Sequence, residues 1–224
     1  DTYNIDPELI ESAITKKTKA IIAVSLYGQP ADFKLINKIA AKYDIPVIED
    51  GAQSFGSTHY GDLSCNLSKI GTTSFFPSKP FGAYGDGGAC FTNDKNLAER
   101  IRRISRHGQS RRYFHTEIGI NGRLDTIQAA ILLAKFPLLE SEIRARIQIG
   151  NNYTSSLNSA GFKETPTILK SNTTVYAQYT IQVSNRSFIQ SYLKERGIPS
   201  AVHYPLTLDE QPAFKEKYKL ISNE

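Results

Sequence analysis

The first half of the chain alternates short apolar runs with a segment of helical spacing. The runs Lys19–Leu26 and Ile45–Ile48 are typical of strands buried on both faces. Between them, apolar residues recur at helical spacing: Phe33, Ile36, Ile39, Ala40 and Tyr43. This order predicts two parallel strands joined by a helix in a right-handed crossover.

Three further features extend this α/β pattern. Asp6 and Pro7 predict the N-cap and first position of a short helix. Thr72–Phe76 and Gly88–Thr92 predict two strands around a glycine-rich loop, and Asp94 predicts the cap of the next helix. This half of the chain therefore predicts an α/β layer.

The second half changes in character near residue 124. A long helical pattern over 124–157 is interrupted by Pro137 and is typical of a helix that bridges two domains. After it, Tyr176–Val183 predicts a strand and Phe188–Arg196 a helix, as in a small α+β domain. We therefore expect a large domain over 1–135, and a bridging helix with a smaller C-terminal domain over 136–224.

Composition excludes several classes of protein. No apolar run approaches the roughly 18 residues of a membrane span, and the first residues lack the pattern of a signal peptide, which favours a cytoplasmic protein. The net charge of +5 is dispersed apart from residues 102–112, which also fit a helix end and loop, so we expect an anionic small-molecule ligand and no nucleic acid. Cys65 and Cys90 lack metal-ligand spacing, which predicts reduced structural thiols and no metal site.

Two residues carry candidate chemistry. Lys79 lies between prolines and glycines after an aromatic strand, where a pocket would favour the neutral amine that condenses with an aldehyde as a Schiff base. Asp50 ends a buried strand, the position at which open α/β sheets bind ligands. Taken singly, a structural lysine and a helix-capping aspartate remain open alternatives.

Several motifs in order resemble one enzyme family. They are Tyr27–Asp32, Val47–Ser54, Ser74–Lys79 with Gly85–Gly88, and Gly119–Asp125 with Gln128–Ala130. Together they resemble the DegT/DnrJ/EryC1/StrS sugar aminotransferases, which are fold-type I pyridoxal-phosphate enzymes. The resemblance implies a three-layer α/β/α large domain, a smaller α+β domain, and pyridoxal 5′-phosphate as cofactor.

The resemblance assigns cofactor roles to five residues. Lys79 would hold the cofactor as an internal aldimine and later move the proton at Cα. Asp50 would pair with the protonated pyridine nitrogen. Gln53 would contact the 3-oxygen side of the ring, and Ser74 would donate to the phosphate. Asn121 would contact the phosphate from the neighbouring subunit, which implies a homodimer with shared active sites.

Three further residues are candidates for substrate binding. By resemblance Arg123 would bind a substrate carboxylate, with an exposed arginine at a helix start as the alternative reading. His203 and Tyr204 match a motif near the sugar, although a lone histidine is more often a packed or surface residue. His107 and Gly108 are expected only to form a loop.

The resemblance implies transfer of an amino group, with glutamate as donor, to a nucleotide-diphosphate keto-sugar in surface polysaccharide synthesis. The overall likeness favours 3-keto derivatives of UDP-N-acetylglucosaminuronic acid over 4-keto-6-deoxy sugars. Related dehydratases carry histidine where this chain has Lys79, so the lysine favours transamination. A regulatory protein or an inactive fragment of the same fold is the alternative from another class.

The resemblance also implies parts that this sequence lacks. A glycine-threonine/serine loop at a helix N-terminus, which would bind the cofactor phosphate through backbone amides, would precede Asp1. A last strand and helix of the small domain would follow Leu220–Glu224. We therefore expect the sequence to be part of a longer chain.

Overall fold

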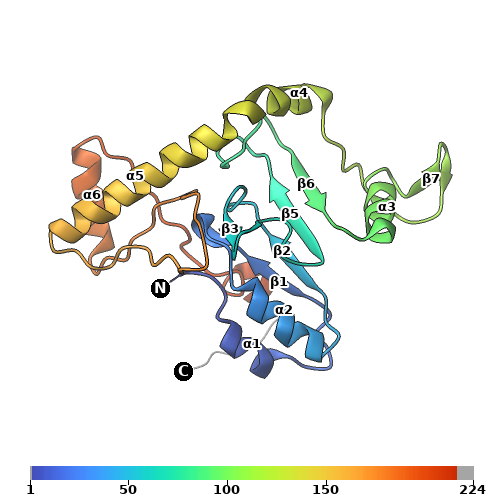
Figure 1. Ribbon diagram of the computed structural model, residues 1–224, viewed down its shortest axis with the longest axis horizontal. Coiled ribbons are helices and arrows are strands. Elements are labelled where there is room, and N and C mark those ends of the chain that lie inside the picture. The colour runs from blue at the N-terminus through green and yellow to red at the C-terminus, as the bar shows by residue number, and fades with distance from the viewer. Residues whose placement is uncertain (1, 216–224) are drawn as a thin grey trace.

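The computed structural model describes residues 2–215, so the expectation about Leu220–Glu224 lies outside the described residues. Its centre is a four-stranded sheet in the order β1 (Ile21–Val24), β2 (Val47–Asp50), β5 (Ile70–Ser74) and β6 (Gly88–Phe91) (Figure 1). The first three strands are parallel, and β6 is antiparallel to β5. The predicted strand–helix–strand unit is therefore confirmed.

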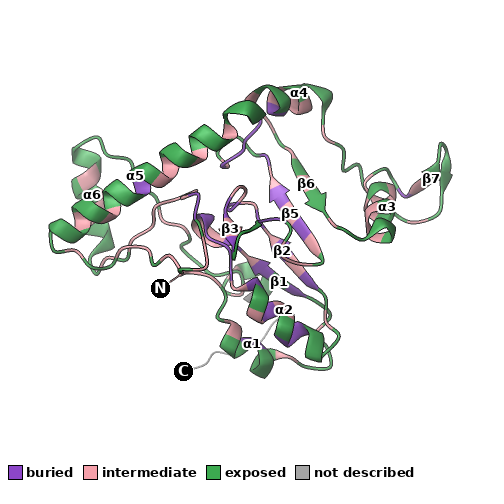
Figure 2. Ribbon diagram, in the orientation of Figure 1, coloured by how far each residue is buried: buried purple, intermediate pink, exposed green. Residues whose placement is uncertain are grey.

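Two helices cover one face of this sheet. They are α1 (Pro7–Ala13) and α2 (Phe33–Lys42), and their apolar residues join those of β1 and β2 in one core (Figure 2). The predicted cap is confirmed because the carboxylate of Asp6 accepts the backbone N–H of Glu8 at 2.9 Å. A short 3₁₀ turn, η1 (Leu26–Gly28), follows β1.

The prediction that the first strand is buried on both faces is wrong. Ile21 and Ala23 point into the core, whereas Ile22 is 62% exposed. Side chains of a strand alternate between faces, and α1 and α2 cover only one face here. Within the described residues, β1 is therefore buried on one face.

A projecting arm follows the sheet. It comprises α3 (Lys95–Ile104), β7 (Gln109–Arg111) and β8 (Phe114–His115), and it extends away from the sheet (Figure 1). Asp94 caps α3 as predicted, because its carboxylate accepts the N–H of Asn96 at 2.9 Å. A small hairpin, β3 (Thr58–His59) with β4 (Asp62–Leu63), lies earlier in the chain.

The long helical pattern is confirmed, including its interruption. The chain forms α4 (Thr126–Lys135), the 3₁₀ turn η2 (Phe136–Leu138) at Pro137, and α5 (Leu139–Ser159). Most of α5 is exposed, and its one buried residue is Gly150 (Figure 2). A Cβ at Gly150 would lie 2.4 Å from the ring of Tyr176, so the helix lies close to this part of the chain.

The strand predicted over Tyr176–Val183 is wrong. The segment is irregular, and its backbone contacts a turn: Gln178 N–H donates to the carbonyl of Tyr27 at 3.4 Å. Within residues 2–215, no strand lies beside it to form a ladder. Its apolar residues pack against α5 and η1 without entering a sheet.

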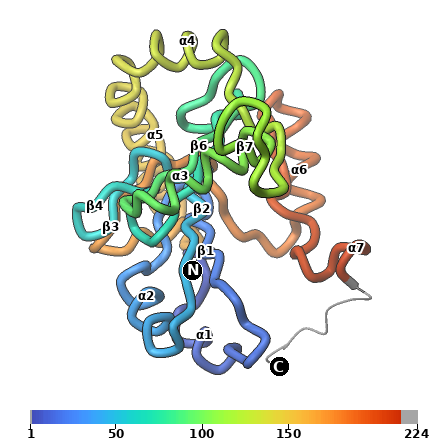
Figure 3. The backbone as a smooth tube through the Cα atoms, turned by 90° about the vertical axis from the view of Figure 1, so that its right-hand side faces the viewer, coloured from blue at the N-terminus to red at the C-terminus, as the bar shows by residue number. Residues whose placement is uncertain are grey.

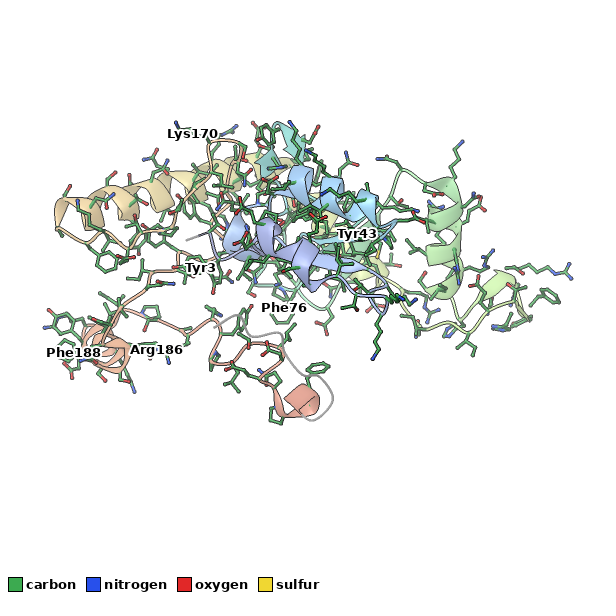
Figure 4. All side chains as sticks on the ribbon, turned by 90° about the horizontal axis from the view of Figure 1, so that it is seen from below. Tyr3, Tyr43, Phe76, Lys170, Arg186 and Phe188 are labelled. Atoms are coloured by element: carbon green, nitrogen blue, oxygen red, sulfur yellow. The ribbon has the colours of Figure 1, made fainter. Side chains whose placement is uncertain are left out.

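The C-terminal helices are α6 (Arg186–Glu195) and α7 (Pro212–Lys215). Figure 3 shows α6 and α7 on the side of the molecule opposite α5, and Figure 4 shows α6, marked by Arg186 and Phe188, apart from the body. The division into domains at residue 135 stays a prediction. Among the described residues, no helix is both long and apolar enough to cross a membrane.

Candidate active site

Asp50 and Ser74 end neighbouring parallel strands at the same edge of the sheet. Asp50 is in register with Thr72, and Gly51 N–H donates to the carbonyl of Thr72 at 2.8 Å. Ser74 is the last residue of β5, two positions farther along. Both side chains are half-buried, so a carboxylate and a hydroxyl are presented together at this edge.

Each of these side chains makes one hydrogen bond as an acceptor. The Asp50 Oδ1 atom accepts the N–H of Ala52 at 3.0 Å, and Ser74 Oγ accepts the N–H of Phe76 at 3.2 Å. The serine proton and the Asp50 Oδ2 atom have no partner among residues 2–215. The edge thus retains one hydroxyl donor and one carboxylate oxygen for a ligand.

Lys79 lies in a tight loop, residues 76–83, that follows β5. Lys79 N–H donates to the carbonyl of Phe76 at 2.9 Å, and Ala83 N–H donates to the carbonyl of Phe75 at 2.7 Å. The loop therefore returns to the strand end at which it began. The Lys79 side chain is half-buried, and no hydrogen bond or ion pair reaches its amino group from any part of the described chain.

Gly82 allows the loop to close. A Cβ at this position would lie 2.6 Å from the Pro77 carbonyl oxygen and 2.7 Å from that of Phe76. Below the loop, the ring of Phe81 stacks on that of Phe55 at 5.5 Å between centroids. Gly82 therefore allows the backbone to close on itself, and the aromatic rings pack beneath the loop that carries Lys79.

Gln53 connects this edge to the C-terminal part of the chain. The side chain is buried; its Oε1 atom accepts the N–H of Tyr27 at 2.7 Å, and its Nε2 atom donates to the hydroxyl of Tyr204 at 3.2 Å. The Tyr27 hydroxyl donates to the carbonyl of His203. The structure therefore brings His203 and Tyr204 to Gln53. In Figure 4, Phe76 lies on the side of the body that faces this C-terminal segment.

Asn121 and Arg123 lie between the arm and α4. Both are exposed, and the Arg123 Nε atom donates to Asn121 Oδ1 at 2.8 Å. Neither makes a hydrogen bond to Asp50 or Lys79 within residues 2–215. Asp50, Ser74 and Lys79 are called the strand-end cluster below. Among the described residues, Asn121 and Arg123 of the same chain make no hydrogen bond to this cluster, and their roles stay predictions. The neighbouring Leu124 packs near the loop glycines, because a Cβ at Gly87 would lie 2.8 Å from it.

Glu49 supports the site from within β2, although it was not among the predicted site residues. Its fully buried carboxylate accepts three hydrogen bonds, from Ser64 Oγ at 2.7 Å, Cys65 N at 2.7 Å and Leu67 N at 3.0 Å. Burial raises the pKa of this carboxyl, and the hydrogen bonds oppose that effect. The signal in the sequence that could have identified Glu49 is an acidic residue within an otherwise apolar strand. Glu49 fixes the loop that lies behind Asp50.

The raised pKa of Glu49 predicts a pH-dependent stability. A carboxyl whose folded-state pKa exceeds its unfolded value stabilises the protein most below the unfolded pKa, and this contribution is lost as pH rises through the folded pKa. We expect the free energy of unfolding of the wild type, minus that of Glu49→Gln, to fall as pH rises from about 4 to about 8. Urea denaturation at a series of pH values measures this difference.

Glu11→Gln is the control for this experiment, because the pKa of Glu11 is shifted in the opposite direction to that of Glu49. Its hydrogen bonds to Tyr43 and Lys42 lower the pKa of the exposed carboxyl. Its contribution is therefore present above the unfolded pKa and lost as pH falls. A wild-type advantage over Glu49→Gln that grows with pH would contradict the assignment of desolvation as the dominant effect.

The described residues contain no group of three or more histidine, cysteine, aspartate or glutamate side chains able to hold a metal ion. Cys65 is a buried free thiol whose pKa is raised to about 12 by burial, and Cys90 is a free exposed thiol. Cys65 is therefore protonated at neutral pH, which agrees with a structural role.

Comparison with known proteins decides the family of this site. The profile of the DegT/DnrJ/EryC1/StrS aminotransferase family matches residues 1–224. The chain belongs to this family. It is 59% identical to the UDP-2-acetamido-2-deoxy-3-oxo-D-glucuronate aminotransferase of Pseudomonas aeruginosa (strain PAO1) over 220 residues, covering 98% of this chain and 61% of that protein.

Two solved structures share the fold of this chain. A family aminotransferase from Brucella abortus superposes with a TM-score of 0.91 at 40% identity, covering 96% of this chain and 59% of that one. NtdA from Bacillus subtilis, solved with its cofactor PMP bound, gives a TM-score of 0.85 at 31% identity and covers 97% and 51%. The fold is that of the pyridoxal-phosphate aminotransferases, and the chain spans about three-fifths of the length of its P. aeruginosa relative.

Proposed function

We propose that this chain forms the catalytic-lysine part of a pyridoxal-phosphate-dependent sugar aminotransferase. The observation that carries the proposal is the half-buried, unpaired Lys79 in a closed loop that starts from the strand end where Asp50 and Ser74 lie. Membership in the DegT/DnrJ/EryC1/StrS family supports the same activity. A relative with the same fold and a regulatory role would not need these three side chains at one edge.

The donor set fits pyridoxal phosphate. A primary amine matches the aldehyde, a carboxylate with one open oxygen matches a protonated pyridine nitrogen, and a serine with a free proton matches a phosphate oxygen. When bound, the cofactor withdraws electrons from the carbon that loses its proton. Lys79 would hold the cofactor, Asp50 its ring nitrogen, Ser74 its phosphate, and Gln53 the side of the ring.

The chain's own residues would divide the chemistry among them. The amine of Lys79 would hold the cofactor and would move the proton at the reacting carbon, first as general base and then as general acid. The Asp50 carboxylate would hold the ring nitrogen and favour its protonated form, because an opposite charge stabilises that form. Lys79 reaches the site from a loop fixed at both ends, which limits the range of positions its amine can adopt.

We propose a nucleotide-diphosphate keto-sugar as amino acceptor and glutamate as donor. The relative at 59% identity is named for a 3-oxo-glucuronate derivative carried on UDP, which supports a UDP-linked 3-keto sugar. We propose that the amino sugar it forms enters surface polysaccharide synthesis. Arg123, His203 and Tyr204 are the proposed substrate contacts. The lysine at position 79 supports transamination over dehydration.

We further propose a homodimer with shared active sites in the cytoplasm. Asn121 and Arg123 are exposed and make no hydrogen bond to the Asp50 and Lys79 side chains of their own chain, which agrees with a role in a neighbouring subunit's site. Under this arrangement the partner's copy of this segment would complete the phosphate and carboxylate contacts. Pyridoxal phosphate and the sugar would then bind between the two subunits.

Trapping of the cofactor on the protein tests this proposal. Pyridoxal phosphate is added to the purified protein, borohydride is then added to make the linkage permanent, and the labelled peptide is found by mass spectrometry. We expect the label on Lys79, because its amine is half-buried and unpaired. The control is prior addition of glutamate, which should discharge the cofactor from the lysine and reduce labelling. Labelling spread over exposed lysines, and unchanged by glutamate, would contradict the proposal.

A further inference from the structure

Tyr27 has a backbone conformation that is unusual for a bulky residue. It lies in η1, directly after β1, with φ 58° and ψ 2°. Such a left-handed conformation persists only where the surrounding structure holds it. The next residue is held just as tightly, because a Cβ at Gly28 would lie 2.7 Å from the backbone nitrogen of Tyr176. The turn is therefore fixed from both sides.

This conformation directs the Tyr27 backbone N–H at Gln53. The Tyr27 nitrogen lies 2.7 Å from Gln53 Oε1, and a backbone N–H can only donate a hydrogen bond. The oxygen of the Gln53 amide must therefore face Tyr27, and its NH₂ group must face Tyr204, whose hydroxyl is 3.2 Å away. Because Gln53 is 5% exposed, water has little access to stabilise the reversed amide.

The Tyr27 side chain makes a second link to the same C-terminal residues. Its hydroxyl donates to the carbonyl of His203, and its ring packs edge-on against that of Tyr3 at 5.1 Å. Burial raises the pKa of Tyr27, so the hydroxyl keeps its proton and remains a donor at neutral pH. One residue thus contacts Gln53 through its backbone and the His203–Tyr204 segment through its side chain.

We propose that Tyr27 is a positioning residue for the active site. Its backbone N–H sets the orientation of the Gln53 amide, so that the NH₂ group faces Tyr204, a proposed substrate contact. Its hydroxyl docks the His203–Tyr204 segment beside Gln53. The consequence for sugar binding rests on the proposed function, whereas the docking itself depends only on this chain.

Proteolysis of the chain without cofactor tests the docking. Chymotrypsin cleaves after exposed aromatic or leucine residues that are not followed by proline, so Leu206 and Leu208 are its sites beside Tyr204. Loss of one hydrogen bond in Tyr27→Phe should raise the rate of cleavage there roughly threefold to tenfold. Tyr3→Phe is the matched control, since Tyr3 packs on the same ring but makes no hydrogen bond to the His203–Tyr204 segment of the described chain. Equal cleavage rates in the two variants would overturn the proposal.

A second variant tests the amide link. Gln53→Met keeps the length of the side chain but removes the acceptor for Tyr27 N–H and the donor to Tyr204. We expect it to increase cleavage at the same sites by a similar factor, with a further increase in the Tyr27→Phe/Gln53→Met double variant. Cleavage of Gln53→Met at the wild-type rate would overturn the role of the amide.

A kinetic measurement separates positioning from a general loss of structure. In the longer, cofactor-loaded enzyme, Tyr27→Phe should raise KM for the keto-sugar about tenfold and leave the half-reaction with glutamate unchanged. Equal losses in both half-reactions would show that Tyr27 only stabilises the fold. If the protein binds no pyridoxal phosphate, the proposed function fails, while the proteolysis result still decides whether Tyr27 docks the segment.

Discussion

Replacement of Lys79 by arginine should lower the rate of amino transfer at least about a thousandfold, since general acid–base catalysis alone contributes 10²–10⁴-fold. Arginine has comparable bulk, but its guanidinium stays protonated and forms no stable linkage to the cofactor. The loop itself should be preserved, because its hydrogen bonds at Phe76 and Ala83 involve only the backbone. The measurement is single-turnover conversion of each half-reaction, with glutamate and with a UDP-linked 3-keto sugar.

Lys95→Arg is the matched control, because Lys95 is an exposed lysine at the start of α3, on the arm that projects away from the sheet (Figure 1). We expect it to retain wild-type rates. The free energy of unfolding of Lys79→Arg should remain near that of the wild type, which separates catalysis from folding. A Lys79→Arg enzyme with more than about a tenth of wild-type activity would exclude Lys79 as the acid–base group.

Gly71→Ala should lower the free energy of unfolding by about 3 kcal/mol, the upper part of the usual range for overpacking. A Cβ at Gly71 would lie 2.1 Å from the carbonyl oxygen of Cys65 and 2.5 Å from its carbonyl carbon. These are backbone atoms of the loop that Glu49 holds through Cys65 N and Leu67 N, so they cannot rotate away. Relief requires a shift of the whole loop or of β5. Urea denaturation of the wild type and the variant measures the change.

Gly61→Ala provides the comparison. Gly61 has a positive φ of 90°, but no atom lies within 4 Å of a Cβ built there. Only backbone strain should act, which costs about 1 kcal/mol. A destabilisation of Gly71→Ala no larger than that of Gly61→Ala would mean that the Cys65 loop moves aside easily, and that Glu49 does not fix it.

Local sequence patterns were sufficient to predict the features that depend only on residues a few positions away in the chain. The caps at Asp6 and Asp94 and the interruption at Pro137 depend on neighbouring backbone groups, and each is found as expected. The two parallel strands followed from apolar runs around a helix. Because parallel strands end at a common edge, the adjacency of Asp50 and Ser74 was also implicit in the order of elements.

The errors concern features that depend on distant partners. Exposure of Ile22 depends on which face of β1 the helices cover, which its apolar run does not record. The Tyr176–Val183 segment has the composition of a strand but, within the described residues, no neighbouring strand. The left-handed Tyr27 results from contacts with residues about 150 positions away in sequence, and no local residue preference predicts it.

The close contact at Gly150 affects how the C-terminal part of the chain can move. Helix α5 contacts the body where Ile143 meets Gly56 and where Gly150 meets Tyr176. Beyond Gly150 the helix continues to Ser159 over roughly 13 Å, at 1.5 Å per residue, and there Thr154 Oγ1 lies 2.8 Å from the hydroxyl of Tyr179. A tilt of about 10° at Gly150 would displace the end of the helix by about 2 Å, so a small change at one glycine would shift both the contact with Tyr179 and the point where the chain leaves for α6.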